Sequence, residues 1–275
     1  MKTKTFILGG FIALSAISLL CGCKKEYNFE GTEYNRNIKT LVWADEFDKD
    51  GAPNPENWIY EVGYVRNKEA QFYTFNDRKN VRVENGMLVI EAHKDSSAKN
   101  PITSGSIKTV GKREFLHGRI EARAKIPSGR GTWPAIWTVG VPLKEGDGWP
   151  KNGEIDIMEY VGYNPKVMTA NVHTYGSVRL KTDKVKNGFQ KEIADLDTEW
   201  HTYALEWTKD ELKFFIDGKQ FGSYPRPANA NYWAFDNPHF MIVNLAIGGA
   251  WGGNKGIDDA IFPAKFLVDY IRYYR

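Results

Sequence analysis

Apolar and polar residues alternate with a period of two along several segments of the chain. In "GRIEARAKIP" every second residue from Ile120 to Ile126 is apolar, and "HTYALEW" has the same pattern. This period is typical of a half-buried strand. Asn85-Gly86 and Asp217-Gly218 predict tight hairpin turns between further strands. No long segment has a helical period, so we expect an all-β fold, a jelly-roll β-sandwich of two antiparallel sheets.

The N-terminus has the pattern of an export signal. Lys2 and Lys4 precede an apolar run from Phe6 to Leu20, which ends in "LLCGC". The run is too short for a typical membrane span and suits a secretory signal. The stretch "LCGC" resembles the bacterial lipoprotein box, in which Cys23 would be lipidated. An ordinary cleaved signal and a buried core helix are the alternatives.

These observations predict three parts of the chain. Residues 1–22 are expected to be a lipoprotein signal peptide, 23–38 the lipidated cysteine with a flexible tether, and 39–275 a single sandwich domain. The chain is then exported and anchored by lipid to the outer membrane. The stretch "KKEYNFE" after Cys23 resembles the surface-export tails of gut Bacteroidetes lipoproteins and favours the cell surface, with the periplasmic face left open.

Cysteines and charge exclude several classes of protein. The only cysteines are Cys21 and Cys23, so the expected domain has no disulfide and depends on its own core. The net charge is +3, and no basic run lies beyond Lys24-Lys25, which argues against a nucleic-acid partner. Nine Trp, fourteen Tyr and fifteen Phe provide candidates for stacking on flat ligands. We expect a monomer.

The segment "NGEIDIMEYVG" holds the strongest candidate for chemistry. In a regular strand Glu154 and Asp156 share one face, and Glu159 points to the other, into the core. An unpaired carboxylate in the core is costly. One extra residue, a β-bulge, would turn both Ile157 and Met158 inward and return Glu159 to the face of the other two acids. On spacing alone, a solvated acidic face is equally compatible.

The bulged geometry would suit a glycosidase. The outer Cα atoms would lie roughly 13 Å apart, and side chains that lean together could bring the two glutamate carboxyls to about 5–6 Å, the spacing of a retaining enzyme. Asp156 lies between Glu154 and Glu159 and is too short for either role. It could form a hydrogen bond to whichever glutamate acts as the nucleophile, and its negative charge could help to raise the pKa of the glutamate that acts as the acid.

Residues 154–159 also resemble a known family. "GEIDIMEYVG" is similar to the E-x-D-x-x-E signature of glycoside hydrolase family 16, and "FLHGRIEARAKIPSGRGTWPAIWTVG", "HTYALEWTKDELKFFIDG" and "FMIVNLAIGGAWGG" resemble other family blocks in the right order. The resemblance covers roughly residues 40 to 275. It implies a jelly roll with a substrate cleft on the concave face, Glu154 as nucleophile, Asp156 as its helper and Glu159 as general acid/base.

Other residues are candidates for the cleft. Trp133 and Trp137, four apart in "WPAIW", would share one face of a strand, and Trp251 stands between glycines in a flexible loop. An indole in a cleft can stack on a sugar ring, although a core tryptophan is the commoner case. The resemblance further implies Asn67, Glu69 and Arg113 as sugar-binding residues, with a plain salt bridge equally compatible for Arg113. For His173 we expect a hydrogen bond to Glu159 or to the sugar.

Metal chemistry is not expected. The five histidines are scattered and lack the spacing of a zinc site. The resemblance implies one structural calcium at Glu46, Gly86 and Asp269, the first two through backbone oxygens, and no cofactor for the reaction. An isolated Asp such as Asp269 is usually just exposed.

The resemblance to the laminarinase-like branch implies an endo-acting retaining β-glucan hydrolase, which cuts internal β-1,3 or β-1,4 linkages of β-1,3- or mixed-linkage β-1,3/1,4-glucan. The alternatives are a surface glycan-binding lipoprotein without activity, and a hydrolase of agar- or porphyran-type galactans. An intact pair of outer glutamates favours an enzyme over a pure binder.

Overall fold

Two antiparallel sheets pack face to face in a computed structural model that describes residues 29–142 and 148–275. One sheet has ten strands in the order β15-β14-β13-β8-β17-β5-β6-β3, with β1 beside β17 and β4 beside β5. Its strands are β1 (Leu41–Asp45), β3 (Phe72–Tyr73), β4 (Val81–Glu84), β5 (Met87–Lys94), β6 (Ile102–Ser104), β8 (Gly118–Lys125), β13 (His201–Trp207), β14 (Glu211–Ile216), β15 (Lys219–Pro225) and β17 (Ala264–Tyr274).

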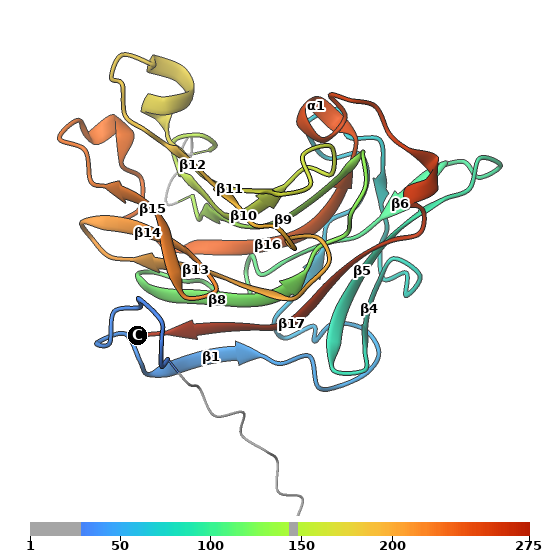
Figure 1. Ribbon diagram of the computed structural model, residues 1–275, viewed down its shortest axis with the longest axis horizontal. Coiled ribbons are helices and arrows are strands. Elements are labelled where there is room, and N and C mark those ends of the chain that lie inside the picture. Colours follow the sequence, from blue (N-terminus) through green and yellow to red (C-terminus); the bar gives the residue numbers. More distant parts are fainter. Residues whose placement is uncertain (1–28, 143–147) are drawn as a thin grey trace, which may run out of the picture. The chain divides into compact units, whose positions relative to one another are not determined.

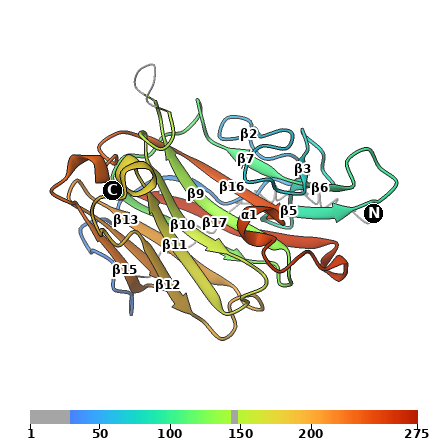
Figure 2. The ribbon, with the colours of Figure 1, turned by 90° about the horizontal axis from the view of Figure 1, so that it is seen from above.

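The second sheet has seven strands in the order β12-β11-β10-β9-β16-β7-β2, and Figure 2 shows β16, β9, β10, β11 and β12 side by side. Its strands are β2 (Ile59–Tyr60), β7 (Ser106–Lys108), β9 (Thr132–Gly140), β10 (Glu154–Tyr160), β11 (Val167–His173), β12 (Gly188–Glu192) and β16 (His239–Ile247). The expected all-β jelly roll of two antiparallel sheets is confirmed. The short β3–β6 pair is parallel.

Helices in the described part of the chain are single turns. They are the π-helix η1 (Gly176–Leu180), the 3-10 helices η2 (Ala230–Tyr232) and η3 (Asp259–Ile261), and α1 (Gly249–Gly252). "GGAWGG", expected to be a flexible loop, thus contains one helical turn, α1. No helix among the described residues is long and apolar enough to span a bilayer. The predicted signal peptide and Cys23 lie outside the described residues.

The alternating pattern fills the space between the sheets. Ile120, Ala122 and Ala124 of β8 point into the core, as the alternation predicts. Asp217 and Gly218 both have positive φ, 47° and 71°, and turn β14 into β15. The Asn85-Gly86 turn between β4 and β5 is similar, with φ of 55° and 71°. Both predicted hairpins are confirmed, and their primed turns suit the twist of paired strands.

The outer face of the ten-stranded sheet is less exposed than alternation predicts. Arg119 and Glu121 of β8 are 1% and 6% exposed. The guanidinium of Arg119 lies over the ring of Tyr34, 4.4 Å from its centroid, and over that of Tyr274, at 4.6 Å. Alternation correctly predicted which residues face the core but could not show that the opposite face is also covered.

Part of the predicted tether covers this face. Glu33 donates its backbone N–H to Gly218 and Asn35 donates its own to Glu206 Oε1, both at 2.7 Å. Tyr34 is 5% exposed and its ring meets Phe215 edge-on at 5.1 Å. The compact unit therefore begins at Gly31 and not at residue 39. The prediction of a flexible tether to residue 38 is wrong for residues 31–38, because one buried tyrosine outweighs their polar composition.

We predict that Tyr34→Ala lowers the free energy of unfolding by roughly 2–4 kcal/mol, since a large buried ring is lost. Tyr34→Phe, which keeps the ring, is the matched control and should cost less. Urea unfolding followed by tryptophan fluorescence measures both. A loss below about 0.5 kcal/mol for Tyr34→Ala, the range of surface substitutions, would mean that this segment does not contribute to the folded unit.

Candidate active site

The acidic strand β10 has the predicted bulge. Against β11, Asp156 pairs with Asn171 and Glu159 with Thr169, so three steps on β10 match two on β11. The register against β9 shifts at the same place, between Asp156 and Met158. The bulge hypothesis is confirmed, because Ile157 and Met158 are both buried in the core, 1% and 0% exposed.

All three acids line one cleft on the open face of the seven-stranded sheet. The cleft has a volume of about 990 Å³. Strands β9, β10, β11, β12 and β16 supply its floor, and residues of loops, of η1 and of α1 supply its walls. The predicted residues that line it are Trp133, Trp137, Asn67, Glu69, His173 and Trp251, together with Glu154, Asp156 and Glu159.

Two segments far apart in sequence join to form one wall. Residues 66–70 form a turn in which Asn67 has a positive φ of 54°, and Glu69 forms a β-bridge with Gly248. Ala250 donates its backbone N–H to Asn67 and Ala70 donates to Ile247, both at 2.8 Å. The backbone alone thus fixes Asn67 and Glu69 close to α1, which carries Trp251.

Glu159 is held by two side-chain donors. Trp133 Nε1 donates to Oε1 at 3.0 Å, and Asn171 Nδ2 donates to Oε2 at 2.7 Å. Trp133 is therefore bonded to the acid row, the set of Glu154, Asp156 and Glu159, and also lines the cleft. The ring of Trp251 meets that of Trp133 edge-on at 5.5 Å. The fixed carboxyl faces the cleft from one side of the row.

His173 contacts a different acid from the one predicted. Its Nε2 lies 3.2 Å from Asp156 Oδ2 and 3.7 Å from Glu154 Oε1. The expected hydrogen bond to Glu159 is absent among the described residues, since Asn171 and Trp133 hold that carboxyl. The cross-strand register explains the difference, because Glu154 pairs with His173 directly, whereas Glu159 pairs with Thr169, four residues from His173 along β11.

Burial and mutual repulsion raise the pKa values of the acid row. Loss of water and, as the next cause, the charge of Asp156 raise the pKa of Glu154 to about 8. Burial likewise raises the pKa of Asp156, with the charge of Glu159 as the next cause, and burial raises the pKa of Glu159 against its two N–H donors. Like charges this close cannot all ionise. The row therefore retains protons at neutral pH and titrates as one unit.

Arg66, Asn244 and Trp149 line the cleft as well and were not predicted. Trp137 donates from Nε1 to Asn244 Oδ1 at 2.7 Å, and the guanidinium of Arg66 lies 5.0 Å from the centroid of its ring. Arg66 is itself paired with Glu61. One face of Trp137 is therefore partly covered by an arginine, which no spacing in the sequence indicates. Trp149 is 48% exposed and lines the cleft.

Arg113 does not line the cleft. Its Nε donates to Asn57 Oδ1 at 3.0 Å, and the residues that surround the acid row do not include it. The expectation of a sugar contact is corrected to a structural hydrogen bond, because the chain turns away from the cleft between β7 and β8.

Two of the residues expected to hold calcium have carboxylates that pair with arginines. The carboxylate of Asp269 accepts from Arg123 at 2.8 Å. The carboxylate of Glu46 accepts from Arg272 Nε and NH2 at 2.7 and 3.0 Å. Gly86 occupies a hairpin turn with a φ of 71°. Arg123 therefore already pairs with the one carboxylate expected to bind the ion, while the backbone oxygens of Glu46 and Gly86 are not involved in these contacts, and the structural calcium stays a prediction.

A jelly roll with two glutamates on one face of a bulged strand, indoles beside them and raised pKa values defines a glycoside hydrolase. The chain belongs to glycosyl hydrolases family 16, whose sequence profile matches residues 68–272. The family resemblance seen in the sequence is thereby confirmed.

Curated relatives and solved structures agree with this family. A "Beta-glucanase" of Rhodothermus marinus is 43% identical over 244 residues, which cover 86% of this chain and 85% of the relative. The structure of the laminarinase from Rhodothermus marinus superimposes with a TM-score of 0.80 at 42% identity, over 86% of this chain and 97% of that one. SCLam, described as a non-specific endo-β-1,3(4)-glucanase, has a TM-score of 0.78 at 40% identity, with 86% and 91% covered.

We predict that Glu154→Gln stabilises the fold as the pH rises. The pKa of Glu154 is raised to about 8 in the folded state from an ordinary value of 4.5, so the folded state binds more protons than the unfolded one between these values. Its contribution to stability is present below pH 4.5 and is lost as pH rises towards 8. At pH 8 the variant should gain roughly 4 kcal/mol over the wild type, since each pKa unit corresponds to about 1.4 kcal/mol.

Urea unfolding at pH 4 and at pH 8 measures this difference. The variant and the wild type should have closely similar stabilities at pH 4. An advantage that is equal at both pH values would show that the burial of Glu154 is not linked to its charge.

Proposed function

We propose that this chain is an endo-acting, retaining β-glucan hydrolase. It would cleave internal β-1,3 or β-1,4 linkages of β-1,3-glucan or of mixed-linkage β-1,3/1,4-glucan. The observation that carries the proposal is the bulge in β10, which places Glu154 and Glu159 on the same side of one cleft. The names of the relatives, a β-glucanase and an endo-β-1,3(4)-glucanase, support glucan as the substrate.

The roles of the two glutamates follow from their surroundings. Glu159, fixed by Trp133 and Asn171, would protonate the leaving glycosidic oxygen while Glu154 attacks the anomeric carbon. Glu159, now ionised, would then take a proton from a water whose oxygen attacks the anomeric carbon. The bond between that carbon and Glu154 breaks, and the sugar leaves with its configuration retained. The active form holds the proton on Glu159 and has Glu154 ionised, one microstate of a row that shares its protons.

Asp156 and His173 would control which microstate forms. Asp156 is 2% exposed and lies between the two glutamates on the cleft face. Because burial raises its pKa, a protonated Asp156 can donate to the nucleophile. The imidazole of His173 lies near both Asp156 and Glu154, and its charge favours ionisation of Glu154. These contacts support a positioning role for both residues.

The open cleft supports cutting within a polymer. Its lining runs from Gln190 on β12, at one edge of the sheet, across to Arg66 and Asn67 in the loop wall. Trp133, Trp149 and Trp251 offer aromatic surface along this path, and stacking on a sugar ring is worth about 1 kcal/mol. A cleft that crosses the sheet suits a chain that continues on both sides of the cut.

We predict that the protein releases reducing sugars from laminarin, barley β-glucan or lichenan but not from agarose. Glu154→Gln should lower kcat at least about 10³-fold, because the nucleophile is lost, and should still bind laminari-oligosaccharides in calorimetry. Sized products distinguish internal from terminal cleavage, and NMR of the first product tests retention.

Three results would contradict this proposal. Activity on agarose alone would favour the galactan alternative. Binding of glucan without any hydrolysis by the wild type would favour a glycan-binding protein. An inverted first product would exclude the nucleophilic role of Glu154.

We further propose that the protein is exported and lipid-anchored through Cys23 to the outer membrane, at the cell surface. The basic flank, the apolar run and "LCGC" in the sequence support this location. We predict that Cys23→Ser moves the protein from the membrane fraction to the soluble fraction and abolishes incorporation of labelled palmitate. External protease should remove the wild type from intact cells. Unchanged membrane association of the variant would count against lipidation.

A further inference from the structure

We infer that the acid row is also a binding site for a transition-metal dication, with Zn²⁺ as the ion it fits best. Three side chains would hold the ion: Glu154 through Oε1, Asp156 through Oδ2 and His173 through Nε2. One ligand atom from each lies within 4.8 Å of the other two. An ion held there would cover the proposed nucleophile, so the site would act as an inhibitory one.

The spacing of the donor atoms is the first argument. Zn²⁺ binds imidazole nitrogen and carboxylate oxygen at about 2.0–2.2 Å with tetrahedral geometry, so two of its ligands lie about 3.3–3.6 Å apart. His173 Nε2 is 3.2 Å from Asp156 Oδ2 and 3.7 Å from Glu154 Oε1. These separations bracket the tetrahedral edge. The third separation, between the carboxylates of Glu154 and Asp156, is within 4.8 Å, and rotation of these two side chains would bring it to the tetrahedral edge.

The second argument is an oxygen atom that has no hydrogen-bond donor. Asp156 is 2% exposed and lines the cleft, and within the described part of the chain its Oδ2 accepts no hydrogen bond. A buried carboxylate oxygen is normally satisfied, because leaving it unpaired costs free energy. His173 Nε2 is the near neighbour of this oxygen. A dication between the two would satisfy both atoms at once.

Access and charge also suit a cation. The side chains of His173 and Glu154 are 32% and 17% exposed, so an ion can enter from the cleft and keep water as its fourth ligand. In the described residues the third acid, Glu159, is held by the neutral donors Trp133 and Asn171. No cationic side chain is recorded against Glu154 or Asp156 there other than His173.

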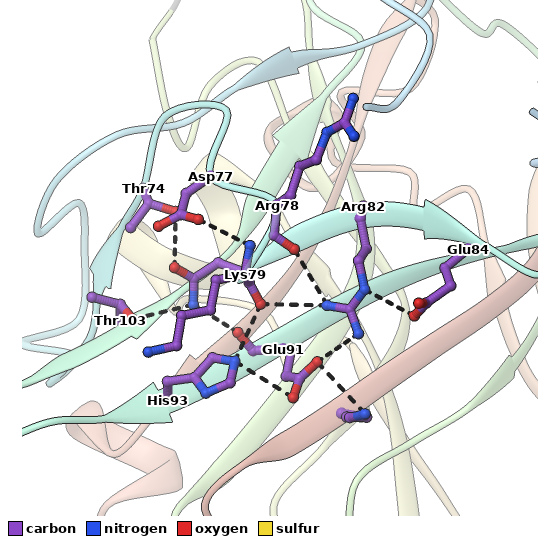
Figure 3. A network of polar contacts seen from close by, with 11 residues as sticks. Thr74, Asp77, Arg78, Lys79, Arg82, Glu84, Glu91, His93 and Thr103 are labelled. Atoms are coloured by element: carbon purple, nitrogen blue, oxygen red, sulfur yellow. Dashed lines mark hydrogen bonds and ion pairs between the residues drawn. The ribbon is translucent and has the colours of Figure 1, made fainter. Parts of the chain in front are cut away.

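Another histidine–carboxylate contact shows what such a site requires. His93 Nε2 lies 3.4 Å from Glu91 Oε1 on the ten-stranded sheet (Figure 3). Glu91 Oε2, however, accepts from Arg82 at 2.8 Å and lies 3.7 Å from Lys265 Nζ. Two cations already neutralise this carboxylate, and they would repel a metal ion. The distance between histidine and carboxylate is similar at both places, whereas only the cleft lacks the competing cations.

The choice of ion follows from the ligand set. One imidazole and two carboxylates favour Zn²⁺ or Cu²⁺ over Mg²⁺ and Ca²⁺, which prefer more oxygen ligands. Three donor atoms are also too few to replace the coordination shell of Ca²⁺. The ligand set, and not the ionic charge, therefore discriminates between these dications.

Calorimetric titration of the untagged full chain with ZnCl₂ tests the site without any substrate. We predict one Zn²⁺ site in the wild type and in Glu159→Gln, which keeps all three ligands. His173→Gln and Glu154→Gln should each bind at least about tenfold more weakly. His93→Gln is the matched control and should bind like the wild type, and Mg²⁺ should give no binding at the same concentration. Circular dichroism verifies that each variant is folded.

Equal Zn²⁺ affinity in the wild type and in both ligand variants would overturn the inference, as would the absence of Zn²⁺ binding to the wild type. Because Cys21 and Cys23 can also bind Zn²⁺, the difference between variants is the decisive measurement. Inhibition is tested separately and rests on the proposed function. Zn²⁺ should raise the KM for laminarin at least several-fold, and EDTA, which removes the ion, should restore it. Binding without any laminarin hydrolysis would contradict the proposed function and leave the metal site standing.

Discussion

The rest of the site depends on keeping three like-charged carboxyl groups together on one strand, away from most of the solvent. Each of them loses hydration, and each repels its neighbours, so the row is stable only with protons retained and with donors placed around it. The donors come from both neighbouring strands, Trp133 on β9 and Asn171 on β11. A sandwich with a fully packed core holds these strands in fixed register, and that rigidity is what makes the arrangement possible.

The opposite sheet provides part of this rigidity. Its outer face buries Arg119 and Glu206 under residues 31–38 and surrounds the guanidinium with the rings of Tyr34 and Tyr274. Both layers of the sandwich therefore have buried charges, but they differ in kind. On the outer face opposite charges compensate one another, whereas in the cleft like charges accumulate. Strain of that kind is typical of a site that does chemistry, and it is offset by stability elsewhere.

The sequence allowed the bulge to be predicted because only one arrangement keeps Glu159 out of the core. It also allowed the hairpins to be predicted, because Asn-Gly and Asp-Gly have a strong preference for one turn geometry. The partner of His173 could not be predicted, since the register between β10 and β11 depends on pairing across a loop. Arg113 was misjudged for a related reason, because its partner Asn57 is remote in sequence, and the partner of Asp269, Arg123, could not be foreseen for the same reason. The packing of residues 31–38 against the sheet depends on one aromatic residue, Tyr34, in a polar segment. That signal is too weak to distinguish a packed segment from a flexible tether.

The wall formed by residues 66–70 and α1 is joined by main-chain hydrogen bonds, through Ala70 to Ile247 and through Ala250 to Asn67. Main-chain bonds do not depend on which side chains the residues carry. Substitutions at Asn67 or Trp251 can therefore alter what the cleft recognises while the wall keeps its position. Substitution of these side chains would let proteins that descend from one ancestral gene bind different polysaccharides while strand β10 stays unchanged.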